Sequence, residues 1–164
     1  MPVTKSLRTV KLGALAAIVL LLLVFTPFGV SINGAQRWIG VGGFTIMPGE
    51  LAKPAVAIFA AKFISDPERI KSFKNGVLPL LVVMGLVAAL ILKQPNMSTA
   101  VTVAGIMICV MMVGGMKIPH LAVLLGAGVG AGGLLMAIEP YRWKRFISFL
   151  DPFKDAQGAG FQVV

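Results

Sequence analysis

The chain has 164 residues, of which 57% are hydrophobic and only 13% charged, and its net charge is +9. Soluble domains are about 45–50% apolar and about 25% charged, and disordered chains are poor in hydrophobic residues, so both classes are excluded. The basic residues lie between apolar runs, which favours membrane lipids over nucleic acid as their partner.

Apolar runs long enough to cross a bilayer recur along the chain. A membrane-spanning helix needs about 20 largely apolar residues, within a range of about 17–25. Turn-forming residues separate the runs, and the runs lack the alternating polarity of β-barrel strands. The predicted fold is therefore an all-α integral membrane protein with a single membrane domain. Its five predicted transmembrane helices lie near residues 12–30, 48–64, 77–92, 99–116 and 121–138.

Polar segments connect and follow these helices. They are a Gly-rich loop over 31–47, a basic loop over 65–76 and a basic, aromatic tail over 139–164. Short cytoplasmic loops carry an excess of Lys and Arg, so the loop over 65–76 is predicted to be cytoplasmic. The other two segments are then on the outer side. Because a basic outer tail opposes the charge rule, its cations are interpreted as binding an anionic substrate.

Cysteine and histidine are too few to form a site of their own. Cys109 is the only cysteine and His120 the only histidine. This excludes an internal disulfide and a Cys/His metal centre within the chain.

Glu50 and Lys53 form the most informative ionisable pair. They are three residues apart and therefore neighbours on one helix face. Pro48 suits the first helical position, and Glu50 then falls in the first turn, where the helix dipole favours an acid. Ionisable groups at membrane depth cost at least about 2.5 kcal/mol each and usually face a bundle interior. The pair is either an interfacial ion pair that caps a helix or part of a substrate cavity.

Aromatic and basic side chains alternate in the outer tail, at Tyr141, Arg142, Trp143 and Arg145. One interpretation is an interfacial helix whose aromatic rings anchor at headgroup depth. The other is a site for a diphosphate or an anionic headgroup, because the Arg guanidinium matches phosphate oxygens.

Five sequence blocks form a family pattern: Asn33–Gly40, Pro48–Lys53, Gln94–Thr99, Tyr141–Pro152 and Gly158–Gln162. In order and spacing they resemble the SEDS family of membrane proteins, and within it the FtsW, or division, branch most. The resemblance covers essentially the whole chain and implies that its helices belong to a larger helical bundle. The structural motif residues that it indicates are Trp38, Pro48, Gln94, Pro95, Asp151 and Pro152.

The resemblance implies a peptidoglycan glycosyltransferase of the bacterial cytoplasmic membrane. Such an enzyme polymerises lipid II, an undecaprenyl diphosphate-linked disaccharide peptide, together with a class B penicillin-binding protein and other division proteins. Cations or a divalent metal ion would neutralise the departing diphosphate. The alternatives are a lipid II flippase and a RodA-type elongation polymerase. The expected substrate-binding residues are Arg37, Glu50, Lys53, Arg142 and Arg145.

The sequence also departs from the family pattern. Met47-Pro-Gly-Glu50 stands where Gln-Pro-Ser-Glu is usual, and Pro95-Asn-Met-Ser-Thr99 stands where Pro-Asp-Leu-Gly-Thr is common. The resemblance places further helices on both sides of this stretch and the catalytic carboxylate beyond Val164. The chain is therefore expected to be a central fragment that contains no catalytic residue and has no polymerase activity alone.

Overall fold

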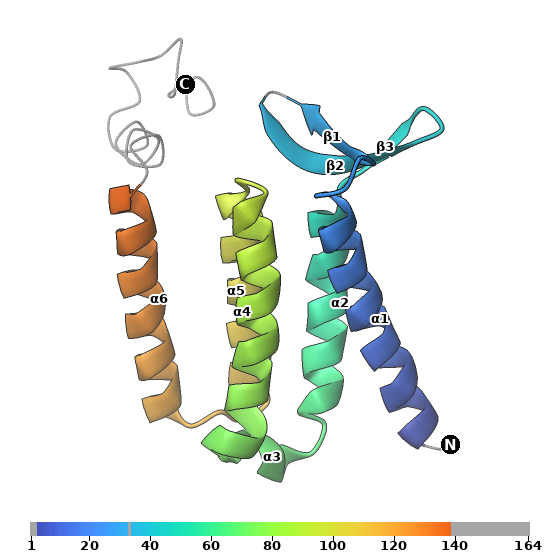
Figure 1. Cartoon of the computed structure of the whole chain (residues 1–164). Helices are drawn as coiled ribbons and strands as arrows, with labels where there is room; N and C mark the ends of the chain where they lie inside the picture. Colours follow the sequence, from blue (N-terminus) through green and yellow to red (C-terminus); the bar gives the residue numbers. More distant parts are fainter. Residues whose placement is uncertain (1–2, 33, 139–164) are drawn as a thin grey trace, which may run out of the picture. The chain divides into compact units, whose positions relative to one another are not determined.

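The computed structural model of the chain describes residues 3–32 and 34–138 and is mostly helical (Figure 1). The chain divides after Lys117 into two compact units. The first unit contains the strands β1 (Gly29–Ile32), β2 (Ala35–Val41) and β3 (Phe44–Ile46). Its helices are α1 (Val3–Leu23), α2 (Pro48–Phe63), α3 (Pro67–Lys71), a π-helical turn (Phe73–Val77), α4 (Leu78–Lys93) and α5 (Met97–Val113). The described part of the second unit is α6 (Ile118–Ile138).

Buried residues spaced four apart form the core of the first unit. They are Ala52, Val56 and Ala60 on α2 and Val103, Met107 and Met111 on α5. Residues four apart lie on one helix face, so each set makes a continuous stripe. α2 packs against both α1 and α5, and α4 packs against α5. The small side chains on α2 allow these backbones to approach closely.

The segment over 31–47, predicted as a loop, contains a small antiparallel sheet, so the all-α prediction is wrong here. The strands lie in the order β1-β2-β3, and Val30 of β1 pairs with Trp38 of β2. Gly42 and Gly43 connect β2 to β3 with φ angles of 58° and 87°, which glycine adopts without steric cost. The strands are short and interrupted by glycines, so they lack the long alternation that indicates β structure.

The first helix differs from the predicted span over 12–30. α1 begins at Val3 and ends at Leu23. Pro27 explains this end, because its ring would clash with the carbonyl of the residue four positions earlier. The Thr26 hydroxyl donates to the Leu23 carbonyl at 2.6 Å and satisfies one of the open carbonyls at the helix end.

Other segments also differ from the prediction. The basic loop predicted over 65–76 contains α3 and the π-helical turn. α5 begins at Met97 rather than at Thr99, because the Asn96 side chain caps the helix one residue before it. Both differences add short ordered segments where the sequence predicted irregular chain.

Only part of the helical content meets the requirements of a membrane span. Within the described ranges, the helical stretch Phe73–Lys93 is long and apolar enough to cross a bilayer. Met97–Val113 and Ile118–Leu134 are apolar but shorter. The mostly helical architecture is confirmed, and the number of spans stays a prediction.

Candidate functional site

One end of the first unit gathers most of the residues that the sequence singled out. α1 and α4 end there, α2 and α5 begin there, and the sheet lies beyond the ends of α1 and α2 (Figure 1). We call this the sheet end. The end formed by α3 and the π-helical turn is the opposite end.

Arg37 ties the sheet to the turn between α4 and α5. From β2, its Nε donates to the Gln94 carbonyl at 3.2 Å and its Nη2 donates to the Pro95 carbonyl at 2.5 Å. Carbonyls at a helix C-terminus lack helical partners and carry the negative end of the dipole, so a guanidinium suits them. Arg37 is an expected substrate ligand, but two of its three guanidinium nitrogens bind backbone carbonyls and so stabilise the fold.

Gln94 extends the same connection to α1. Its side chain is 1% exposed, and its Nε2 donates to the Leu21 carbonyl at 3.0 Å. Leu21 lies in the last turn of α1, where carbonyls again lack helical donors. Arg37 and Gln94 thus join β2, α4 and α1 through side chain to backbone hydrogen bonds.

Glu50 and Lys53 form an ion pair in the first turns of α2. Pro48 is the first residue of α2 and Glu50 lies in its first turn, as the sequence predicts. The Lys53 Nζ and Glu50 Oε2 atoms are 2.5 Å apart. The Lys53 side chain is 26% exposed and that of Glu50 54%, so the lysine side chain is the more buried of the two. The carboxylate holds the ammonium in place and leaves part of it accessible.

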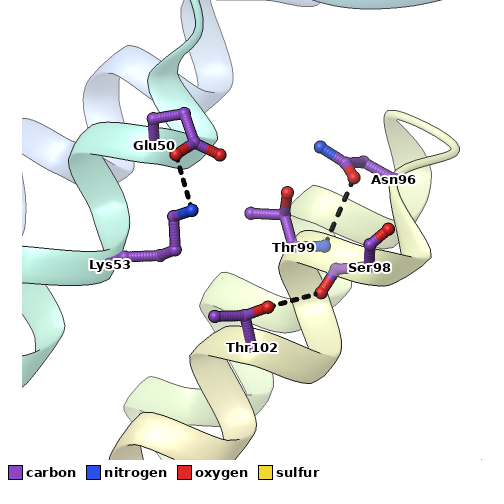
Figure 2. A network of polar contacts seen from close by, with 6 residues as sticks. All are labelled: Glu50, Lys53, Asn96, Ser98, Thr99 and Thr102. Carbon is purple, nitrogen blue, oxygen red and sulfur yellow. Dashed lines mark hydrogen bonds and ion pairs between the residues drawn. The ribbon is translucent and has the colours of Figure 1, made fainter.

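The beginnings of α2 and α5 meet beside this pair (Figure 2). Asn96 Oδ1 accepts a hydrogen bond from the Thr99 N–H at 3.3 Å and so caps α5. A Cβ on Gly49 would come within 3.2 Å of Thr99 Cγ2, which shows how closely the two helices approach. Asn96 is buried, and its Nδ2 has no hydrogen-bond partner among the described residues.

Sequence reasoning gave no role to Gly49 or Asn96. For Asn96 a signal was present, because Asn immediately before an apolar helical run is a preferred N-cap. For Gly49 no such local signal exists, since its importance comes from a contact with Thr99, 50 positions further along.

Positive charge dominates the sheet end. The N-termini of α2 and α5 carry roughly half an elementary positive charge each, which the C-termini of α1 and α4 at the same end offset, so the net charge comes from side chains. Lys53 and Arg37 add full charges, and Lys93 lies over the Phe25 ring at 5.3 Å from its centroid. Glu50 is the single acid at this end in the described part of the chain. Such an arrangement suits the binding of an anionic group.

The structure places the other predicted site residues as follows. Trp38 is half-buried in the sheet. Arg142, Arg145, Asp151 and Pro152 lie outside the described residues. Over 3–32 and 34–138, no three of His, Cys, Asp and Glu gather in a group that could hold a metal ion. Arg37, Glu50 and Lys53 are thus the predicted ligands that share one end of the described fold.

Comparison with known proteins identifies the family. The model of the cell cycle protein family that comprises FtsW, RodA and SpoVE matches residues 1–164. The chain belongs to this family. The resemblance noted in the sequence, to the SEDS membrane proteins, is therefore confirmed.

Curated relatives match most of this chain. Stage V sporulation protein E of Bacillus subtilis is 38% identical over 147 residues, which are 88% of this chain and 40% of that protein. The probable peptidoglycan glycosyltransferase FtsW of Acinetobacter baylyi is 34% identical over 146 residues, 88% of this chain and 37% of that protein. The chain thus spans about 40% of the length of these relatives.

Solved structures share the fold. A chain of a peptidoglycan synthase complex that coordinates polymerization and crosslinking is similar with a TM-score of 0.73 and 30% identity. The similarity covers 98% of this chain and 47% of that one. The rod shape determining protein RodA of Thermus thermophilus is similar with a TM-score of 0.61 and 31% identity, over 78% and 42% of the two chains.

Proposed function

We propose that a protein containing this chain is a peptidoglycan glycosyltransferase that polymerises lipid II. The observation that carries the proposal is the Glu50–Lys53 ion pair, located where two helix N-termini meet. Such a place attracts a negatively charged diphosphate like that of the lipid carrier. Family membership supports the reaction, because relatives of the chain are named probable peptidoglycan glycosyltransferases.

We assign the diphosphate primarily to Lys53. Its ammonium is a compact charge on a flexible stem, and Glu50 keeps it oriented until the substrate arrives. Arg37 contributes its remaining amino group and positions the turn between α4 and α5. Arg142 and Arg145, from the tail outside the described residues, complete the proposed set of cations. A divalent metal ion would supply further positive charge to the same diphosphate.

The proposed reaction joins two lipid-linked sugars. A carboxylate takes the proton of the acceptor 4-hydroxyl, whose oxygen attacks the anomeric carbon of the donor. A glycosidic C–O bond forms while the bond between the anomeric carbon and the diphosphate oxygen breaks. Negative charge then develops on the departing undecaprenyl diphosphate, and the cations of the sheet end stabilise it.

We place the sheet end at the outer face of the bacterial cytoplasmic membrane, in a multi-pass protein with five spans in this segment. The basic connection between α2 and α4 supports this orientation, because short cytoplasmic loops are rich in Lys and Arg. The proposed partner is a class B penicillin-binding protein. Similarity to a chain of a peptidoglycan synthase complex supports it.

We assign the protein to cell division, with other division proteins as partners. The sequence block Gln94–Thr99 and the tail block ending at Pro152 favour the FtsW branch. Relatives named FtsW at 34–37% identity are consistent with it. The protein that contains this chain should restore division when it is expressed in an FtsW-depleted strain. If it instead restores rod shape in a RodA-depleted strain, the assignment to the FtsW branch is contradicted.

The position of the charges favours polymerisation over transport. Transporters bind their substrates near the middle of the bilayer. Lys53 and Glu50 instead lie in the first turns of α2, beside the sheet. This position suits a reaction at the membrane surface.

Reconstitution distinguishes the two activities. Residues 1–164 replace the corresponding segment of the Acinetobacter baylyi FtsW, and the hybrid enters proteoliposomes with fluorescent lipid II. The unmodified relative serves as the control. Glycan chains on a gel support the proposal, whereas movement of the probe between leaflets without glycan chains supports a flippase and contradicts it.

A further inference from the structure

A polar pocket lies at the opposite end of the first unit, away from the proposed substrate site. Its volume is about 680 Å³, and the end of α2, α3 with its N-cap, the π-helical turn and the first turn of α4 line it. The lining side chains that matter here are Arg69, Lys74, Ser72 and Asn75. None of these residues is assigned to substrate binding or to the reaction proposed above.

The walls of this pocket are held firmly in place. Ile70 of α3 and Val77 of the π-helical turn are fully buried, which anchors both elements. Gly76 packs so tightly on the Arg69 carbonyl that a Cβ would lie 2.0 Å from the oxygen. The Ser72 carbonyl accepts hydrogen bonds from both the Gly76 and Val77 N–H groups, at 3.0 and 3.3 Å, which closes the π-helical turn. The backbone of the pocket is therefore preformed, so a ligand has to order only the exposed side chains that line it.

The acids of the pocket already have partners. Asp66 Oδ1 accepts from the Glu68 N–H at 3.2 Å and caps α3. Glu68 Oε1 lies 2.6 Å from Lys71 Nζ. Lys71 neutralises Glu68, whereas Asp66 keeps its negative charge and offsets one of the pocket's two cations, so the pocket together with Lys71 has a net charge of +1.

The cations of the pocket are less engaged. Lys74 has no ion pair or hydrogen bond within the described residues. The Arg69 guanidinium lies 5.0 Å from the Phe63 ring centroid, and its Nη1 donates to the Phe63 carbonyl at 3.4 Å. This arrangement orients the guanidinium but leaves its charge without a carboxylate. The pocket therefore offers two positive groups to an anion.

The pocket lies where the polar connection meets the apolar helix. The helical stretch Phe73–Lys93 has the length and composition of a membrane span and begins beside the pocket. Phe73 is 43% exposed and Leu78 is 42% exposed, so apolar surface continues from the pocket rim along α4. Interfacial positions of this kind are at the depth of lipid headgroups.

We infer that this pocket binds the phosphate-bearing headgroup of an anionic phospholipid. Lys74 and Arg69 contact the phosphate oxygens, and the side chains of Ser72 and Asn75 offer hydrogen bonds to the headgroup ester oxygens or hydroxyls. The acyl chains then follow the exposed apolar surface of Phe73 and Leu78. Charge and position together select a lipid over a soluble anion.

The test titrates the purified 164-residue chain in detergent with phosphatidylglycerol and measures bound lipid by native mass spectrometry. Lys74→Ala should weaken binding about fivefold, the factor for about 1 kcal/mol per cation near an anionic headgroup. Arg69→Ala should have a similar effect. Lys117→Ala is the matched control, because Lys117 is an exposed lysine that does not line the pocket.

Each outcome decides the inference. Weaker phosphatidylglycerol binding in Lys74→Ala, with Lys117→Ala equal to the parent, supports it. The inference is overturned if Lys74→Ala binds phosphatidylglycerol as tightly as the parent chain. It is also overturned if Lys117→Ala weakens phosphatidylglycerol binding as much as Lys74→Ala does. Displacement of the lipid by millimolar inorganic phosphate also overturns it, because the site would then recognise a free anion. Lys74→Ala keeps the test valid if Arg69→Ala fails to fold.

Discussion

Arg37 and Gln94 are 57 positions apart in sequence, yet the Arg37 Nε donates to the Gln94 carbonyl at 3.2 Å. The side chain of the same Gln94 donates to the Leu21 carbonyl at 3.0 Å. The Gln94 carbonyl therefore accepts a hydrogen bond from β2, and the Gln94 side chain donates a hydrogen bond to α1. This connection fixes the ends of three elements around the first turns of α2.

Replacing Arg37 by lysine tests the first part of this connection. Lysine can reach one carbonyl but cannot donate to both in the planar geometry of a guanidinium. We expect Arg37→Lys to lower the free energy of unfolding by about 1.5–3 kcal/mol, the value of one hydrogen bond from a charged donor. Denaturant titration in detergent measures it. Arg8→Lys, at an exposed position on α1, is the control and should leave stability unchanged.

Replacing Gln94 by leucine tests the second part. The buried Leu21 carbonyl then loses its donor, which costs about 1–3 kcal/mol. The same titration should show this loss. Gln36→Leu removes only an exposed contact of 3.4 Å and should change stability by less than about 0.5 kcal/mol. Equal effects of the two substitutions would contradict the role given to Gln94.

Gly76 tests the firm packing of the opposite end. An added methyl group would meet the Arg69 carbonyl oxygen at 2.0 Å and the Ile70 Cα at 2.8 Å. Both contacts are with backbone, so we expect Gly76→Ala to destabilise the chain by at least about 2 kcal/mol. Gly85→Ala, in a helix with open space around the glycine, should instead stabilise by about 0.5–1 kcal/mol. A neutral Gly76→Ala would show that the π-helical turn is less rigid than described.

The local features of the fold could be predicted from the sequence. Pro48 begins α2 and Glu50 lies in its first turn, as helix-start preferences indicate. The spacing of Glu50 and Lys53 predicted that they are neighbours, and they form an ion pair. These features depend on residues within one or two helical turns, which is the range over which sequence patterns are informative.

The long-range features could not be predicted. The Arg37 contact with the turn after α4 depends on how distant segments pack, and no local pattern contains that information. The sheet was missed because its strands are short, although Gly42-Gly43 between β-forming residues is a hairpin signal. The end of α1 at Leu23 was missed because the apolar run continues past it to Val30, beyond Pro27.

In the proposed function, Lys53, held by Glu50, binds the diphosphate of the lipid substrate. The most direct measurement compares lipid II polymerisation by the hybrid enzyme with Lys53→Ala and with Lys62→Ala. Lys62 is a lysine in the last turn of the same helix, at the opposite end. Lys53→Ala should slow glycan synthesis at least about tenfold, and Lys62→Ala should leave it unchanged. Polymerisation at the parental rate in Lys53→Ala would contradict the claim.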